Sequence, residues 1–170
     1  MSQKWSGNFF AYGSWSFEGG GASFTPPDRS LELNGTDEYF TCGDALDLSI
    51  SSAWSMSVWY DYDATANGRI FGAQSSKLWM QVLTNNFVLF NYTGDNGSYY
   101  RPYTTQHAVN NSWTHVVITK AAAVAGASFK IYIDGTDRTD TFLVSGTPND
   151  LTVRNPGRAG NDEGAEFFNV

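Results

Sequence analysis

The sequence is short of cysteine, of positive charge and of long apolar runs. Cys42 is the only cysteine among 170 residues, so no disulfide can form within the chain. Ten Lys and Arg residues stand against 17 Asp and Glu residues, which gives a net charge of −7. Because nucleic acids and anionic membranes bind basic surfaces, we expect neither as a partner. No stretch approaches the roughly 20 apolar residues that span a bilayer.

Other functional signals are also missing. Residues 1–13, MSQKWSGNFFAYG, contain no continuous apolar segment, so no secretory signal is predicted and folding in a reducing cytoplasm is expected. Two histidines, His107 and His115, are too few for a zinc site, and His115 is interpreted as structural. The glycines at 19–21 lack the Lys-Ser/Thr that follows a phosphate-binding loop, so they are interpreted as a hinge.

What the chain does contain is a series of short segments in which apolar and polar residues alternate. An aromatic share of 16% together with 17 glycines is typical of sheets with tight turns. Alternation with period two predicts strands that have one buried and one solvated face. The clearest such strand is predicted at 54–62, with Trp54, Met56, Val58, Tyr60 and Tyr62 on one face. Further strands are predicted at 30–34, 39–42, 69–73, 78–82, 87–92, 142–144 and 151–153.

The segment 113–135 has the strongest pattern. Val116 and Ile118 alternate with their neighbours in a first predicted strand, and residues 129–133 alternate in a second. The Asp134-Gly135 pair that follows can adopt the positive φ angles of a tight hairpin.

Three blocks of the sequence resemble laminin G-like domains of the concanavalin A-like lectin and glucanase superfamily. They are SLELNGTDEYFTCGD, WSMSVWYDYDATANGRIFGAQ and WTHVVITKAAAVAGASFKIYIDG, in the family's order and spacing. The resemblance implies an all-β fold, a two-sheet antiparallel jelly-roll sandwich over residues 30–170. It implies a structural role for Trp59, which matches the Trp of the family's central strand. The closing strand of the family is expected to be shortened or missing, because the chain reads EFFNV at 166–170.

Residues 1–29 lie outside this resemblance and form an extended aromatic arm. Burying one large apolar side chain is worth about 1.5–3 kcal/mol, so the arm is expected to pack against protein. It can wrap its own sandwich, or it can pack on a neighbouring subunit by strand addition or arm exchange. The candidate subunit contacts are Trp5, Phe9, Phe10, Tyr12, Trp15 and Phe17.

Neither catalysis nor metal binding is predicted. Glycoside hydrolysis needs two carboxyl groups across the sugar bond. Asp61 and Asp63 lie on one strand face, but no Glu follows and the Glu-x-Asp-x-x-Glu motif of the related glucanases is absent. Together with Asn67 they could offer three oxygens to a calcium ion at the rim, but an Asp/Asn/Gly turn is the favoured interpretation. We therefore expect a protein that is not an enzyme and has no cofactor.

Sugar binding is harder to dismiss than catalysis or metal binding. Sugars stack on aromatic rings, while nearby amides and arginines bond their hydroxyls. One loop and strand start gathers such groups, and an adjacent strand adds a tryptophan on a face expected to be exposed. The favoured interpretation is nevertheless that the tyrosines pack between the sheets or against the arm. The candidates are Trp79, Asn96, Tyr99, Tyr100, Arg101 and Tyr103.

The leading functional hypothesis is a non-catalytic structural or adhesion subunit. The resemblance links isolated sandwiches of this kind with capsid decoration and tail fibre proteins of bacteriophages. We therefore expect a virion surface protein, assembled in the host cytoplasm as a homo-oligomer or part of a larger assembly. Its expected partners are other virion subunits and surface glycans. A stand-alone carbohydrate-binding lectin domain is the alternative, and a degenerate glycoside hydrolase is the third possibility.

Overall fold

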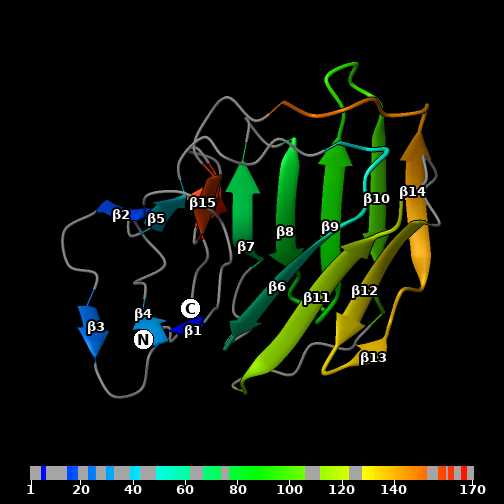
Figure 1. Ribbon diagram of the computed structural model, residues 1–170. Coiled ribbons are helices and arrows are strands. Elements are labelled where there is room, and N and C mark those ends of the chain that lie inside the picture. Colours follow the sequence, from blue (N-terminus) through cyan, green and yellow to red (C-terminus); the bar gives the residue numbers. More distant parts are fainter. Residues whose placement is uncertain are drawn as a thin grey trace.

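The computed structural model describes residues 49–61, 67–73, 77–105, 112–122 and 128–152, together with the backbone of eight short strands elsewhere. The described residues form antiparallel strands in two packed sheets and contain no α-helix (Figure 1). The predicted all-β sandwich is therefore confirmed. None of the described segments forms a helix with the length and apolar character that crossing a bilayer requires.

The first sheet has seven strands. Its order is β13-β12-β11-β6-β1-β4-β3. In that order the strands are Thr136–Asp137, Phe129–Ile133, Thr114–Lys120, Trp54–Tyr60, Trp5–Ser6, Ser30–Glu32 and Ser23–Thr25.

The second sheet has eight strands in the order β14-β10-β9-β8-β7-β15-β5-β2. They are Thr141–Ser145, Tyr99–Tyr103, Val88–Thr93, Leu78–Val82, Gly68–Ala73, Gly157–Ala159, Tyr39–Cys42 and Trp15–Glu18. A separate ribbon of β16 (Asn161–Asp162) and β17 (Glu166–Phe167) lies beside β7.

The core lies between the two sheets, whose strands cross at an angle (Figure 1). In β6 and β11 every second side chain is turned inward, as the sequence alternation predicts. Trp54 packs its ring against Phe90 of the facing sheet and against Phe129 of its own sheet, with ring centroids 5.9 and 5.6 Å apart. The apolar contacts across this gap hold the sheets together.

The predicted strand at 54–62 is largely confirmed. Its inward residues are the four that the pattern predicts, from Trp54 to Tyr60, while Ser55, Ser57 and Trp59 face outward. Asp134 and Gly135 have φ angles of 48° and 79°, so the turn that follows β12 also forms as expected. Tyr62 lies outside the described residues.

The closing strand, expected to be shortened or missing, is present and short, with three residues. Strand β15 lies between β5 and β7 and pairs with both, so the carboxyl-terminal region completes the eight-stranded sheet. Its three residues, Gly157–Ala159, carry no alternation that could reveal a strand. Backbone pairing alone identifies it. Of the strand predicted at 151–153, Leu151 makes an isolated bridge and residue 153 lies outside the description.

Three strands of the aromatic arm pair within the same chain. Strand β1 lies between β4 and β6, β2 pairs with β5, and β3 pairs with β4. Trp5, Trp15 and Phe17 belong to these strands, whereas Phe9, Phe10 and Tyr12 lie outside the described residues. Contact of the arm with a neighbouring subunit, and a domain boundary near residue 30, stay predictions.

Candidate binding surfaces

The predicted sugar site falls on β10 and the turn before it. Residues 99–103 form a full strand, so their side chains alternate between the two sides of the sheet. Tyr99, Arg101 and Tyr103 are half-buried and face outward, whereas Tyr100 and Pro102 are buried. The strand therefore separates the predicted residues into two groups.

Tyr100 belongs to the core and not to a sugar site. Its side chain is 5% exposed, and its ring meets Phe129 edge-on at a centroid distance of 6.0 Å. The alternative that tyrosines pack between the sheets holds for this residue, because the strand begins at Tyr99 and turns the next side chain inward.

Trp79 is also buried, contrary to the expectation of an exposed sheet surface. It is 7% exposed, although it lies on the outward side of β8. The guanidinium carbons of Arg69 and Arg101 lie 4.6 and 5.2 Å from the centre of its ring. Cation–π contacts of this kind cover the ring that a sugar would need for stacking.

Arg101 connects this tryptophan to the outward tyrosine. Its guanidinium carbon lies 4.7 Å from the ring centre of Tyr99, and its Nε donates a hydrogen bond to Asn91 Oδ1 at 3.0 Å. Asn91 in turn donates from Nδ2 to the carbonyl of Lys77 at 2.8 Å and to Thr93 Oγ1 at 3.0 Å. The sequence reasoning missed Asn91 and Arg69, although both occupy outward positions on strands next to β8.

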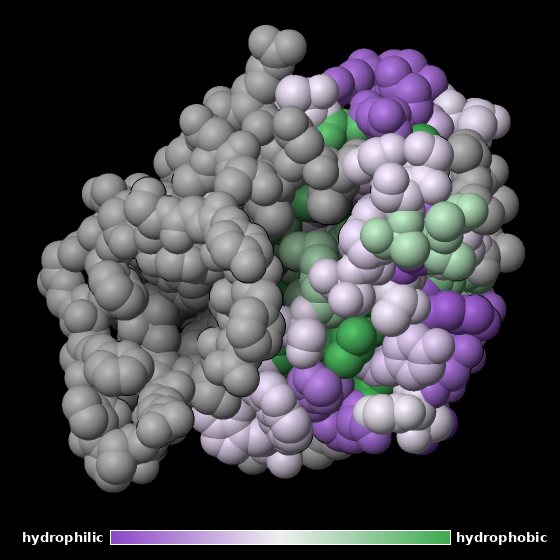
Figure 2. All heavy atoms as spheres, in the orientation of Figure 1, coloured by the Kyte–Doolittle hydropathy of each residue, from purple (hydrophilic) through white to green (hydrophobic). Residues whose placement is uncertain are grey.

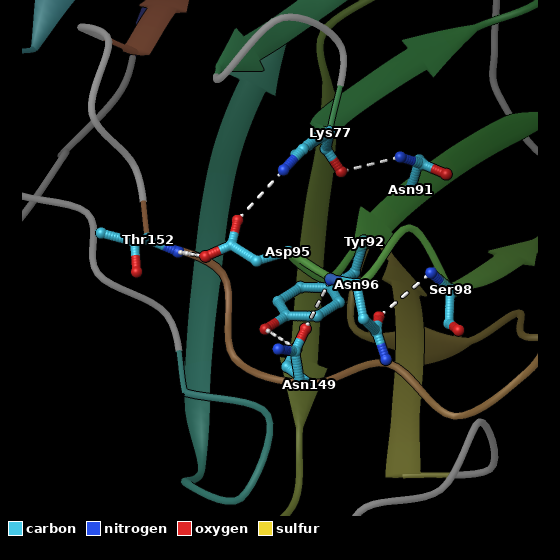
Figure 3. Close-up of polar contacts among 8 residues, drawn as sticks. All are labelled: Lys77, Asn91, Tyr92, Asp95, Asn96, Ser98, Asn149 and Thr152. Carbon is cyan, nitrogen blue, oxygen red and sulfur yellow. Dashed lines mark hydrogen bonds and ion pairs between the residues drawn. The ribbon is translucent and has the colours of Figure 1, made fainter.

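Asn96 holds the β9–β10 turn in place (Figure 3). Its backbone N–H donates to Asn149 Oδ1 at 2.9 Å, its Nδ2 donates to the carbonyl of Thr147 at 3.0 Å, and its Oδ1 accepts from the backbone N–H of Ser98 at 3.1 Å. The amide that was a candidate sugar ligand is therefore engaged in the structure of the rim. Tyr103, the remaining candidate, stacks with Phe87 at a centroid distance of 6.4 Å.

Asp95 ties the same turn to two other segments. Its carboxylate accepts from Lys77 Nζ at 3.0 Å and from the backbone N–H of Thr152 at 3.3 Å (Figure 3). The hydrogen bond from Lys77 holds the pKa of this carboxyl below its usual value. Tyr92 reaches the same rim, where its hydroxyl donates to the carbonyl of Asn149 at 3.1 Å, and burial raises the pKa of this phenol.

The possible calcium ligands lie near another turn. Asn67 Oδ1 accepts from the backbone N–H of Thr84 at 2.9 Å, so it supports the turn after β8. Asp61 follows β6, and Asp63 lies outside the described residues. Within the described ranges, no group of three or more His, Cys, Asp or Glu side chains could hold a metal ion.

A second surface, on the outer side of β6 and β11, was not predicted. Trp59 is 42% exposed and stacks on His115, with ring centroids 4.6 Å apart and planes 13° from parallel. His115 Nε2 and Ser57 Oγ are 2.8 Å apart. Trp113 lies just before β11, two residues ahead of His115, and it is 36% exposed. We call Trp59, His115 and Trp113 the aromatic ridge.

The signal for this ridge was present in the alternation of β6. The pattern turned Trp59 outward together with Ser55 and Ser57, and a tryptophan among serines on a solvated face is unusual. Assigning Trp59 to a structural role hid that signal. Over the described residues, the face toward the viewer in Figure 2 is mostly pale to purple, with green confined to small separate patches.

Comparison with known proteins identifies the family to which the chain is similar. A family model for the concanavalin A-like lectin/glucanases superfamily, of the laminin G type, matches residues 34–170. The search of curated proteins found no significant match.

Proposed function

The chain belongs to the concanavalin A-like lectin/glucanases superfamily, and from that premise we propose that it is a non-catalytic structural and adhesion subunit. In its fuller form, the proposal places the subunit on the surface of a bacteriophage particle, as capsid decoration or as part of a tail fibre. The aromatic ridge is the observation that carries the adhesive role.

The ridge has the chemistry of a contact surface. Trp59 and Trp113 expose large rings, while His115 and Ser57 offer polar groups beside them. Exposed Trp residues are enriched where proteins meet partners, because one ring combines apolar area with a hydrogen-bond donor. Ser55 and Ser57 share the outer face of β6 with Trp59, and this mixture favours a partner that offers both hydroxyls and apolar faces, such as a glycan.

The carboxylates of the described rim and turns support a non-catalytic role. Asp95 is bound by Lys77, Asp137 by Lys130, and Asp140 by Thr105. Asp134 accepts from the backbone N–H of His115 at 2.9 Å, and Asp150 accepts from that of Ile50 at 2.7 Å. Each of these five groups is engaged by a hydrogen bond or an ion pair in a turn or at the rim. A glycosidase instead directs two carboxyl groups at one sugar bond.

Carbohydrate binding at the other sheet is the second candidate function. Tyr99 and Arg101 are half-buried, face outward and lie in contact, so together they offer a ring edge and a guanidinium. Trp79 would orient Arg101 through the contact between its ring and the guanidinium group.

A glycan array and a cell-binding assay test both surfaces together. The purified chain is compared with Trp59→Ala and with Tyr99→Ala, which removes an outward aromatic residue from the opposite sheet. We expect Trp59→Ala to lose most of the binding to glycans and cells, and Tyr99→Ala to retain it. Loss in Tyr99→Ala alone would move the site to β10. Binding unchanged in both variants, or absent from the wild type, would overturn the adhesive role.

The location on a particle needs its own experiment. Antibodies against the chain, applied to particles from the producing culture, should decorate the particle surface in electron micrographs. Unlabelled particles would overturn the virion assignment and leave the binding result unaffected.

A further inference from the structure

We infer that strand β14 is a self-association edge, through which two copies of the chain pair antiparallel. Strand β14 is the last strand of the eight-stranded sheet and pairs with β10 (Figure 1). Within the described part of the chain, no strand pairs with its other side. Leu143 is 45% and Val144 54% exposed, so the edge is open to solvent. This inference does not depend on the proposed function.

The residues of β14 do nothing to prevent pairing with another chain. Natural edge strands are usually protected by Lys, by Pro, by a bulge or by shortness. The sequence TFLVS has no charge and no proline, and its five residues pair with β10 without a break in register. By contrast β13, at one end of the other sheet, has two residues and ends at Asp137, which forms an ion pair with Lys130.

Hydrogen bonding of the neighbouring strand determines which backbone groups of β14 point outward. The N–H of Thr104 donates to the carbonyl of Val88, so even-numbered residues of β10 direct their backbone groups toward β9. Odd-numbered residues of β10 face β14, and their partners there are odd-numbered too. Phe142 and Val144 therefore direct their N–H and C=O groups away from the sheet.

A two-fold axis at Leu143 makes these groups complementary. In that register Phe142 lies opposite Val144 of the second copy, and each such pair exchanges two N–H···O=C bonds. Leu143 lies opposite Leu143 of the second copy, and Thr141 lies opposite Ser145. The register that forms the backbone bonds also covers the two exposed apolar side chains. One arrangement thus satisfies the polar and the apolar groups of the edge.

Charge does not oppose this register. The next pair outward places Asp140 opposite Gly146, and the carboxylate of Asp140 already accepts from the backbone N–H of Thr105 at 2.7 Å and from its hydroxyl at 2.6 Å. The net charge of −7 acts over longer distances, where salt screens it. Five residues make a small interface compared with the roughly 1,200–2,000 Å² of standard complexes. We therefore expect a weak, reversible dimer.

Sedimentation velocity over the micromolar range tests the dimer at physiological ionic strength. The wild type should shift from monomer to dimer as its concentration rises. Val144→Lys, which places a charge in the new ladder, should stay monomeric, as should Val144→Pro, which removes an outward N–H donor. Val117→Lys puts the same charge on the outer face of the other sheet and should dimerise like the wild type.

Several outcomes would overturn the inference. They are a wild type that stays monomeric at the highest concentration, dimers that persist in both Val144 variants, and loss of dimers in Val117→Lys to the same extent. Near-UV circular dichroism checks that each variant is folded. If Val144→Lys is not folded, Val144→Pro is compared with the wild type instead.

Oxidative cross-linking tests the register itself. In a Cys42→Ser background, Leu143→Cys should form a disulfide-linked dimer, because residues at the two-fold axis lie directly opposite each other. Ser145→Cys in the same background should not, because its opposite residue is Thr141. Equal cross-linking of the two variants, or none with Leu143→Cys, would show that this register is wrong.

Discussion

Lys120 is a charged residue whose side chain is almost fully enclosed. It ends β11 on the inward side and is 2% exposed. Its Nζ donates to the carbonyl of Ala121 at 2.6 Å and lies 5.8 Å from the ring centre of Phe129. Burial removes water from the ammonium group, so the pKa of Lys120 lies below its usual value.

This burial makes stability depend on pH in a defined direction. Between the folded and the unfolded pKa of Lys120, the unfolded chain binds more protons, so the free energy of unfolding rises with pH across that window and is flat on either side. We expect Lys120→Met to remove this rise. Urea denaturation of both proteins, from neutral pH to about pH 10, tests this. The free energy of unfolding of the wild type should increase relative to that of Lys120→Met as the pH rises. A difference that stays constant with pH would contradict the expectation.

Two neighbouring tyrosines on β10 should differ sharply in their effect on stability. Tyr100→Ala removes a ring from the core and should lower the free energy of unfolding by about 3–5 kcal/mol, the usual cost of deleting a buried aromatic side chain. Tyr99→Ala acts on the half-buried outer side and should cost about 1 kcal/mol or less. Urea denaturation compares them, and similar losses would contradict the strand alternation described for β10.

At the scale of elements, the turn between β9 and β10 is held by the segment that contains Asn149. Asn149 accepts from Asn96 and from Tyr92, and Gly94 packs against the backbone of Asn149 (Figure 3). The turn between β9 and β10 therefore depends on a segment more than fifty residues away. A side chain added at Gly94 would push the turn away from the segment that contains Asn149.

The two glycines of this turn should respond differently to alanine. At Gly94 a Cβ would lie 2.6 Å from the carbonyl oxygen of Asn149, so Gly94→Ala must displace that segment and should cost about 1–3 kcal/mol. At Gly97 nothing lies within 4 Å, and the φ of +80° leaves only backbone strain of about 1–2 kcal/mol. Hydrogen exchange of residues 147–152 separates the cases, since only Gly94→Ala should speed it. Faster exchange in both would contradict the contact.

Alternation predicts the faces of β6, β11 and β12 correctly because one side of each strand is buried and the other is solvated. For Trp79 alternation predicts the outward side but not the burial, because Arg69 and Arg101 cover the ring from strands that the local sequence does not connect with it. The sequence places the sugar-site candidates on a loop and strand start, and it does not show that all of Tyr99–Tyr103 is strand, because turn residues precede it. Strand β15 is too short and too small in its side chains for any periodicity.

At the scale of the whole molecule, three strands of the arm are paired into the two sheets. Strand β1 fills a place inside the seven-stranded sheet, between β4 and β6, and β2 extends the eight-stranded sheet beside β5. Removing the arm would leave β6 with an unpaired side in the middle of the sheet.

Truncation tests this directly. A fragment of residues 30–170 should lose the cooperative unfolding of the full chain and tend to aggregate, because exposed strand sides pair with other chains. Size-exclusion chromatography and thermal unfolding of the two proteins measure the difference. A stable monomeric fragment would show instead that the arm is dispensable and that the sandwich begins near residue 30.

The position of β15 has a consequence for biosynthesis. The gap between β5 and β7 stays open until residues 157–159 have left the ribosome, although both neighbours emerge early. Nascent chains can form hairpins such as β11–β12 as they are made. Completion of the larger sheet, however, has to wait for residues 157–159, so products that are truncated before β15 should be ready substrates for proteolysis.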